Sequence, residues 1–350
     1  MKEYFKKIIL RIITWQAQQV LKKYTPKIIA VSGSVGKTST KDAIYTALSG
    51  DFHIRKSEKS QNSDLGVALT VLGVQNAWYD PVGWIKNIAI GFLLLFKKEE
   101  YPEWLVLEVG ADRPGDIEHI AKWIAPDIVV LTRFPDTPVH IEFFNSPEEL
   151  YAEDLKIADT LKEGGVLVVN GDDARANEYI NQNAKSVLRF GFADSADIRG
   201  SGMEYRYADK KVRGMAFRVR TKKHPSTLIT LLGVVGVQHS YPILAAFAIA
   251  EVLGVSFERV VEAFSSFEPP RGRMRILRGV KNTTLIDDSY NSSPEALSFA
   301  LKTLHDIKAE EGRKIAVLAD MLELGEYSVE AHRKAGSEVY EAGADMLYTV

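Results

Sequence analysis

The residues with the clearest chemical meaning form a glycine-rich run near the start of the chain. An apolar segment, Lys27–Ser32, precedes this run, and a helical pattern follows it to about Leu48. Glycines at this spacing let the backbone curl so that its N–H groups face an anion, and a helix N-terminus adds positive potential. A lysine there can reach terminal phosphates, and the next hydroxyl can ligate Mg²⁺. We therefore predict a nucleotide-phosphate site made of Gly33, Ser34, Gly36, Lys37, Thr38 and Ser39.

Two further side chains follow apolar runs that read as strands. Glu108 lies at the end of Trp104–Val109, and His140 follows Asp127–Thr132 after a loop. Open α/β sheets bind ligands at the carboxyl ends of their strands, so both residues are candidates for the site. Taken alone, an acid at a strand end or a histidine in a loop is more often an ordinary surface group.

Apolar strands alternate with helical patterns along most of the chain, which predicts an α/β fold with a mostly parallel sheet. Short, β-branched runs predict strands at Lys27–Ser32, Trp104–Val109, Asp127–Thr132 and Gly165–Asn170, and helices are expected at Pro114–Ile124 and Ser146–Leu161. Period-two alternation over Asp197–Leu232 predicts a small antiparallel insert. Helices follow at Ser240–Leu253 and Ser256–Phe267, and after a Pro-Pro linker strands recur at Thr284–Asp287, Lys314–Leu318 and Met346–Val350.

Two apolar stretches allow more than one interpretation. Met1–Tyr24 has helical apolar spacing with lysines and an arginine off the stripe, which fits a helix packed on its own domain or one lying on an anionic membrane. Trp84–Phe96 is too short to span a bilayer, and we expect a buried helix there rather than an interfacial one.

Composition excludes several classes of protein. The chain has 350 residues, a net charge of −2 and no cysteine, so disulfides, thiolate zinc sites and a cysteine nucleophile are excluded, and nothing indicates nucleic-acid binding. No secretory signal is evident. We expect a cytoplasmic protein.

Five sequence blocks, in order, resemble the Mur ligase family, and most of all its D-alanyl-D-alanine-adding branch. The phosphate loop is the short Gly-x-x-Gly-Lys-Thr-Ser form that this family carries. The other four blocks are Asn62–Thr70, Leu107–Ala111 with Pro114–Ile117, Asp287–Asn291 and Asp320–Gly325. The resemblance covers about Ile28 to Val350.

The resemblance implies an ATP- and Mg²⁺-dependent ligase of peptidoglycan precursor synthesis, which activates a muramyl-peptide carboxylate as an acyl phosphate and joins it to D-alanyl-D-alanine. By resemblance, Lys37, Glu108 and His140 are catalytic, and Thr38, Glu108 and His140 hold metal. His239, Arg273, Asp288 and Asn291 are expected to contact the nucleotide. The implied organisation is a basic helix at 1–26, a central ATP-binding domain at 27–270 and a truncated Rossmann-like domain at 271–350.

Three departures from the family pattern stand out. Asp154 occupies the position of a carbamylated lysine, and our hypothesis is that its carboxylate replaces the carbamate as a catalytic Mg²⁺ ligand. Ser240 and Ile243 cannot both supply the amides expected to hold adenine. The family's front domain, which binds the UDP-sugar, has no counterpart in the 30 or so residues before the loop.

These departures leave rival interpretations open. The chain could be another Mur-type amino-acid ligase, or a non-catalytic ATP-binding partner or scaffold. We expect a monomer, with a peripheral contact at the inner face of the membrane through residues 1–24 as a further hypothesis.

Overall fold

The computed structural model describes residues 2–183, 186–265, 267–309 and 312–350; it describes side chains within these ranges except at residues 2–7 and 181–183. The helices are α1 (Lys2–Tyr24), α2 (Lys37–Leu48), α3 (Asp64–Leu72), α4 (Pro81–Phe96), α5 (Asp116–Ala121), α6 (Pro147–Asp159), α7 (Ala174–Asn183), α8 (Ser240–Leu253), α9 (Phe257–Ser265), α10 (Pro294–Asp306) and α11 (Ser328–Glu341). Short 3-10 helices are η1 (Ile141–Phe143), η2 (Val237–His239), η3 (Val280–Asn282) and η4 (Gly325–Tyr327).

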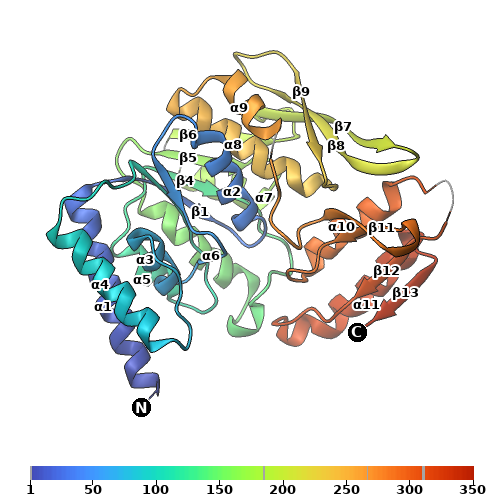
Figure 1. Ribbon diagram of the computed structural model, residues 1–350. Coiled ribbons are helices and arrows are strands. Elements are labelled where there is room, and N and C mark those ends of the chain that lie inside the picture. The colour runs from blue at the N-terminus through green and yellow to red at the C-terminus, as the bar shows by residue number, and fades with distance from the viewer. Residues whose placement is uncertain (1, 184–185, 266, 310–311) are drawn as a thin grey trace.

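One large sheet organises the first three quarters of the chain (Figure 1). Among the described residues its strand order is β2-β3-β1-β4-β5-β6-β7-β8-β9. Strands β2 to β7 pair in parallel, and β7, β8 and β9 pair antiparallel. The strands are β1 (Lys27–Ser32), β2 (Ile54–Lys56), β3 (Trp104–Glu108), β4 (Ile128–Leu131), β5 (Val166–Asn170), β6 (Ser186–Gly191), β7 (Ile198–Ala208), β8 (Lys211–Arg220) and β9 (Thr227–Leu232).

Helices cover both faces of this sheet because its central strands are apolar on both sides. Along β1, Ile28 and Ala30 pack into one core with α3, α5 and α6, whereas Ile29 and Val31 pack into a second core with α2, α8 and α9. Strand β1 lies between β3 and β4, so the chain reverses its direction of travel across the sheet at this point. Such a switch point is where open α/β sheets bind ligands.

The C-terminal part builds two separate strand pairs beside helices α10 and α11. Strands β10 (Arg275–Arg278) and β11 (Thr284–Asp287) are antiparallel, and β12 (Ile315–Leu318) and β13 (Met346–Thr349) are parallel. This part lies at the opposite end of the molecule from α1 and α4 (Figure 1).

Most elements predicted from the sequence are confirmed. Strands β1 and β11 and helix α8 have the predicted bounds, and the other predicted strands and helices begin or end within a few residues of expectation. The predicted antiparallel insert exists as β7, β8 and β9, but it continues the main sheet instead of standing apart from it, because β6 pairs with β7. Within the described residues, no helix is both long and apolar enough to cross a bilayer.

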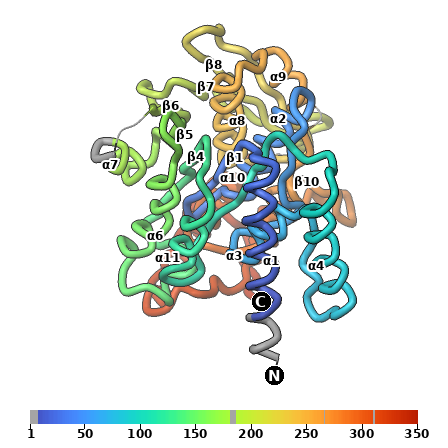
Figure 2. Tube along the Cα trace, turned by 90° about the vertical axis from the view of Figure 1, so that its left-hand side faces the viewer, coloured from blue at the N-terminus to red at the C-terminus, as the bar shows by residue number. Residues whose placement is uncertain are grey.

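Of the two apolar stretches, the first is confirmed as a helix packed on its own domain and the second differs from our expectation. The apolar side of α1, with Ile13 and Val20 fully buried, packs against α3 and α4, so this helix belongs to its own domain. The stripe residues Tyr4 and Phe5 lie outside the described side chains. The prediction that α4 is a buried helix was wrong: it packs on α1 with one side only, at the outside of the molecule (Figure 2).

Candidate functional site

The loop between β1 and α2 has the curled backbone that its glycines predict. Gly33 and Gly36 have φ angles of 119° and 90°, in the region that favours glycine. A Cβ on Gly33 would also come within 2.4 Å of Thr132 Oγ1. The loop therefore needs glycine at Gly33 for space as well as for conformation.

Only part of this loop is free to receive an anion. The amides of Ser34 and Val35 donate to the carbonyl oxygen of Arg133, at 2.9 and 3.2 Å. Ser34 therefore cannot bind a phosphate through its amide while that amide is bonded to Arg133, and its place in the phosphate site stays a prediction. The amides of Lys37, Thr38 and Ser39 open helix α2, where N–H groups have no partner inside the helix, and these can face an anion.

Lys37 reaches across the mouth of the loop. Its ammonium donates to the Gly33 carbonyl at 2.5 Å. An added Cβ at Gly110 would lie 2.9 Å from Lys37 Cε and 3.0 Å from Asn62 Nδ2. The absence of a side chain at Gly110 thus leaves room for the lysine beside the end of β3.

Thr38 and Glu108 meet at the carboxyl ends of β1 and β3. The Thr38 hydroxyl donates to Glu108 Oε1 at 2.9 Å, and the Ser60 hydroxyl donates to the same oxygen at 2.7 Å. The other oxygen, Oε2, accepts no hydrogen bond from the described residues. Glu108 is only 2% exposed. A buried carboxylate beside a hydroxyl provides the oxygen ligands that Mg²⁺ prefers.

Lys41 is a site residue that our sequence reasoning missed. Its side chain is fully buried, with the ammonium 3.5 Å from Glu108 Oε2, and it donates to Ser57 Oγ and the Lys59 carbonyl at 3.1 and 3.0 Å. Burial lowers its pKa, although the charges of Glu108 and Asp42 oppose that shift. One signal was available: Lys41 follows Lys37 by four residues and so shares its helix face.

Asp154 faces the phosphate loop from helix α6. It is 2% exposed; its Oδ2 accepts from the Ser34 hydroxyl at 3.4 Å, and its backbone carbonyl accepts from Ser32 Oγ at 3.0 Å. Oδ1 accepts no hydrogen bond within the described chain. Burial raises the pKa of Asp154 to about 6, against the opposing effects of the Lys37 charge, the Ala111 amide, the Ser34 hydroxyl and the His140 charge.

The neighbours of Asp154 on helix α6 have other roles. Glu153 accepts from the amides of Ile117 and Glu118 at 2.9 and 3.2 Å and so caps the start of α5. Lys156 pairs with Glu153 at 2.6 Å and points away from the loop, as its helical position predicts.

His140 lies where the central and C-terminal parts touch. Its backbone is left-handed, with φ of 65°. Nδ1 contacts the carboxylate of Glu323, from the loop before η4, and Nε2 lies 3.5 Å from Asp112 Oδ1. His140 is thus tied to a residue 183 positions later in the chain, which sequence reasoning did not pair with it.

The four predicted metal ligands divide into two places around the loop. Thr38 and Glu108 touch each other, whereas Asp154 interacts electrostatically with His140 and with Lys37. The described residues contain no cluster of three or more histidines and acids that could hold a metal by themselves. Each place offers one buried carboxylate with an oxygen that accepts no hydrogen bond from the described residues, so a bound cation would complete its shell from phosphate oxygens and water.

Three predicted nucleotide contacts gather in the C-terminal part. Arg273 stacks its guanidinium on Tyr290, 4.2 Å from the ring centre. Asp288 accepts from the Met274 amide at 3.1 Å, and burial raises its pKa to about 6. Asn291 is exposed and accepts from the Ser292 amide. Arg273 and Asp288 therefore organise one turn, and Asn291 lies at its surface.

His239 does not fit the predicted nucleotide contact. It is buried, and its Nε2 lies 3.1 Å from the Arg273 carbonyl oxygen, which fixes the turn that carries Arg273. Burial lowers the pKa of His239 to about 4. A neutral, enclosed imidazole supports the backbone instead of reaching a ligand.

The doubt about adenine recognition is supported by the same segment. The Ser240 hydroxyl donates to the Val237 carbonyl and Ile243 is fully buried, so neither faces a base. Gln238 was missed by sequence reasoning: its buried Oε1 has no partner among the described residues and remains available to a donor.

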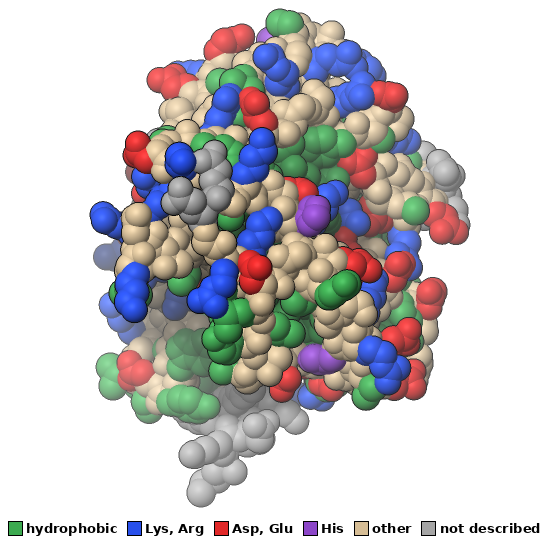
Figure 3. Space-filling view, turned by 90° about the vertical axis from the view of Figure 1, so that its right-hand side faces the viewer, with side chains coloured by type: hydrophobic (Ala, Val, Ile, Leu, Met, Phe, Trp, Pro, Cys, Tyr) green, Lys and Arg blue, Asp and Glu red, His purple; other side chains and the backbone are tan. Residues whose placement is uncertain are grey.

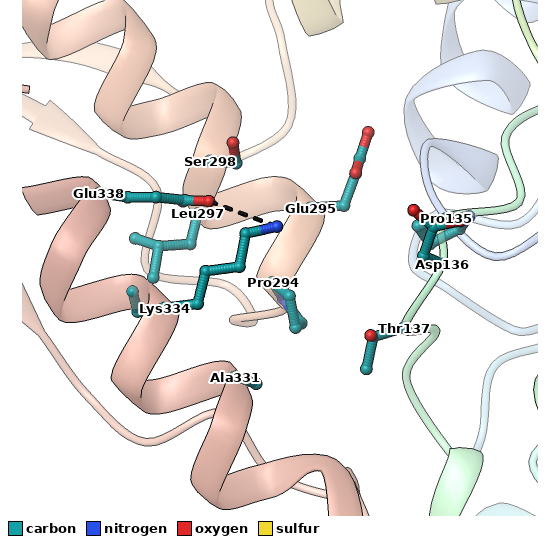
Figure 4. Close-up of a pocket in the computed structure, with 11 residues that line it drawn as sticks. Pro135, Asp136, Thr137, Pro294, Glu295, Leu297, Ser298, Ala331, Lys334 and Glu338 are labelled. Carbon is teal, nitrogen blue, oxygen red and sulfur yellow. Dashed lines mark ion pairs between the residues drawn. The ribbon is translucent and has the colours of Figure 1, made fainter. Parts of the chain in front are cut away.

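Arg133 connects the loop with the C-terminal part. Its carbonyl holds the loop amides, while its Nε lies 2.5 Å from Glu295 Oε1 on α10. A small pocket of about 80 Å³ separates Pro135–Thr137 from α10 and α11, where Lys334 and Glu338 pair (Figure 4). The two parts are therefore in contact at Arg133 and His140 and leave this gap between those contacts.

Comparison with known proteins supports this organisation. The family model described as Mur ligase middle domain matches residues 31–250, and the model described as Mur ligase, glutamate ligase domain matches residues 272–350. Together these two matches include Lys37, Thr38, Glu108, His140 and Asp154.

Individual relatives agree with the family models. UDP-N-acetylmuramoyl-tripeptide–D-alanyl-D-alanine ligase of Bacillus subtilis (strain 168) is 26% identical over 95% of this chain and 64% of its own length. The same-named protein of Mycobacterium leprae is 28% identical over 88% of this chain and 58% of its own length. The chain thus spans less than two thirds of each of these relatives.

Solved structures share the fold. MurF ligase from Thermotoga maritima in complex with ADP matches with a TM-score of 0.78 and 25% identity, over 97% of this chain and 70% of that one. MurF from Acinetobacter baumannii matches with a TM-score of 0.77 and 23% identity, over 97% of this chain and 66% of that one.

Proposed function

Because this chain belongs to the Mur ligase family, we propose that it is an ATP-dependent, ADP-forming ligase that joins D-alanyl-D-alanine to the carboxylate of a muramyl peptide in peptidoglycan precursor synthesis. The observation that carries the proposal is the contact between Thr38 and Glu108 at the mouth of the phosphate loop. The relatives named for this reaction, and a structural neighbour with bound ADP, support it.

In this reaction ATP phosphorylates the carboxylate, the amine then attacks the acyl carbon, and the carbon–oxygen bond to phosphate breaks. Mg²⁺, when bound, neutralises charge on the transferring phosphoryl group. Lys37 and the first amides of α2 would hold the terminal phosphates, and Thr38 with Glu108 would hold a cation. Lys41 keeps the Glu108 carboxylate aimed at that point.

A second cation site is proposed at Asp154 and His140. Asp154 would supply the permanent carboxylate that we expect in place of a carbamylated lysine, and its unused Oδ1 is the available ligand atom. His140 and Glu323 would join the C-terminal part to this site. Asp154 would bind the cation directly or through one water.

The nucleotide is proposed to lie between the loop and the turn of Arg273, Asp288 and Asn291, with Gln238 as an added candidate for the base. We retain the division into residues 1–26, 27–270 and 271–350 as a proposal, with a monomer acting on the cytoplasmic side, where ATP is available. A membrane contact through residues 1–24 alone loses support, because Ile9, Ile13 and Val20 on the apolar side of α1 are buried.

Phosphate release from Mg·ATP by the purified chain, with and without D-alanyl-D-alanine and a muramyl tripeptide, tests the function. Release that needs both substrates, with the new amide seen by mass spectrometry, is expected. Lys37→Ala should abolish release, whereas Lys98→Ala, an exposed lysine far from the loop, should not. ATP binding without substrate-dependent release would instead support a non-catalytic partner, and release with another amino acid would support a different ligase of the family.

A further inference from the structure

Helix α4 is apolar on both of its sides, but the protein covers only one of them. Asn87, Gly91 and Leu94 are buried, on the side that packs against α1. On the other side, Val82, Ile85 and Phe96 are 72%, 67% and 84% exposed. Exposed apolar positions recur every three or four residues along the whole helix, which makes a continuous stripe facing away from the molecule.

Neighbouring residues extend this stripe into a larger surface. Trp15 of α1 is half exposed, and its ring centre lies 6.2 Å from that of Phe92. Trp78 and Tyr79, just before the helix, are 74% and 96% exposed. We define the α4 face as the exposed apolar side chains Trp15, Trp78, Tyr79, Val82, Ile85, Phe92, Leu93 and Phe96. A contiguous surface of this kind indicates an interaction site.

Basic side chains outnumber acidic ones around the α4 face. Residues 8–24 and 78–98 contain six basic side chains and one acidic one, and the exposed acids Glu99 and Glu100 follow directly, in a chain whose net charge is −2. The acidic residue, Asp80, accepts from the Val82 amide and so caps the helix. Lys23 donates to the carbonyls of Leu94 and Leu95 and fixes the other end of α4.

The opposite side of the molecule has a different surface. Basic and acidic side chains are interspersed over the side that carries the C-terminal elements (Figure 3). On that side the two kinds of charge are mixed, whereas basic side chains outnumber acidic ones in residues 8–24 and 78–98.

We propose that the α4 face docks on the surface of an anionic lipid bilayer, with α4 lying in the plane of the interface. Apolar side chains would enter the boundary between head groups and acyl chains, and Lys86, Lys97 and Lys98 would extend to anionic head groups. Trp and Tyr at one end of the stripe are residues that favour this interface. The surplus of lysines around an apolar centre matches anionic lipid better than a second copy of this face, which would repel it.

A second pocket lies beside Trp78, at the edge of the proposed docking surface. This cavity of about 220 Å³ is lined by Ser60, Asn62 and Trp78 among others, and Ser60 is bonded to Glu108. The cavity therefore lies between Ser60, whose hydroxyl is bonded to Glu108, and Trp78 of the α4 face. This step rests on the proposed ligase function. The pocket would then receive the head group of a membrane-anchored carboxylate substrate.

Flotation of the full chain with vesicles of phosphatidylcholine, with and without about 30% phosphatidylglycerol, tests the docking. Binding to the anionic vesicles is expected, and it should weaken about tenfold or more in Ile85→Gln/Phe96→Gln. The matched control is Leu232→Gln/Val280→Gln, because these residues are 66% and 84% exposed on other elements. Lys97→Glu/Lys98→Glu should remove the preference for anionic lipid.

Each other outcome decides against the proposal. Absence of flotation, or equal loss in the two double variants, would overturn it. Light scattering that shows a dimer sensitive to Ile85→Gln/Phe96→Gln would assign the face to a second copy. Turnover of a vesicle-anchored muramyl peptide, compared with turnover of a soluble one, tests the substrate assignment. The assignment fails if Ile85→Gln/Phe96→Gln lowers turnover of the two substrates alike. Flotation does not depend on catalysis, so the flotation result would still hold if the ligase function failed.

Discussion

The ammonium of Lys41 lies 3.5 Å from Glu108 Oε2, and neither side chain is open to solvent. The pair joins helix α2 to the end of β3 directly beneath the phosphate loop. Lys41 also bonds Ser57 and the Lys59 carbonyl, so it places the loop from which Ser60 reaches Glu108. Lys41 therefore holds Glu108, Ser57 and the Lys59 carbonyl together beside the proposed cation site.

Lys41→Met should destabilise the protein, because it leaves the buried Glu108 carboxylate without its counter-charge. We expect a loss of about 3 kcal/mol in the free energy of unfolding, measured by urea denaturation. Lys56→Met is the control, since Lys56 pairs with Asp42 in a partly exposed setting and its loss should cost about 1 kcal/mol or less. Equal losses would show that the Lys41–Glu108 pair is not specially stabilising.

Thr38→Val should lower substrate-dependent phosphate release about a hundredfold and raise the Mg²⁺ concentration required, because it removes a ligand oxygen. Thr38→Ser should restore most of the activity. Thr46→Val, on the same helix but bonded only to the Asp42 carbonyl, should behave like the unaltered chain. An unchanged Mg²⁺ requirement in Thr38→Val would remove Thr38 from the cation site.

Asp154→Ala should also reduce Mg²⁺-dependent turnover by about a hundredfold, since it removes the carboxylate proposed to replace a carbamate. Lys156→Ala, two residues along the same helix, should have little effect because Lys156 faces away from the loop. Unaltered turnover in Asp154→Ala would end the hypothesis. Circular dichroism of both variants separates loss of chemistry from loss of fold.

His239 should make stability depend on pH. Its pKa is about 4 in the folded chain and about 6.5 when unfolded, so the unfolded state binds the extra proton first as the pH falls. Its contribution is complete above pH 6.5 and decreases towards pH 4, by about 3 kcal/mol in total. His239→Gln should flatten this part of the unfolding free energy measured against pH; an unchanged slope would contradict the assignment.

Glu295→Ala should loosen the contact between the central and C-terminal parts, because it removes the partner of the Arg133 guanidinium. A loss of about 1 kcal/mol is expected for this partly exposed pair. Small-angle scattering should then show a larger radius of gyration. Glu338→Ala is the control, since Glu338 pairs with Lys334 within α11; a radius unchanged in both variants would show that other contacts hold the parts together.

Much of the fold was predictable because its signals are local. The apolar run of β1, the repeat of α8 and the glycine spacing of the phosphate loop each depend on residues close together in the chain. The family blocks also located Lys37, Thr38 and Glu108, and the structure brings Thr38 and Glu108 into contact.

The sequence by itself thus determined the α/β class, the family and the phosphate loop. Only the tertiary structure decided which distant groups meet: Ser60 and Glu108 are 48 positions apart, and Glu323 reaches His140 from the far end of the chain. It also decided that Ser34 and His239 are engaged by the backbone of Arg133 and Arg273. Helix α4 shows the physical reason. When a helix is apolar on both of its sides, its own sequence does not indicate which side the neighbouring elements will leave exposed.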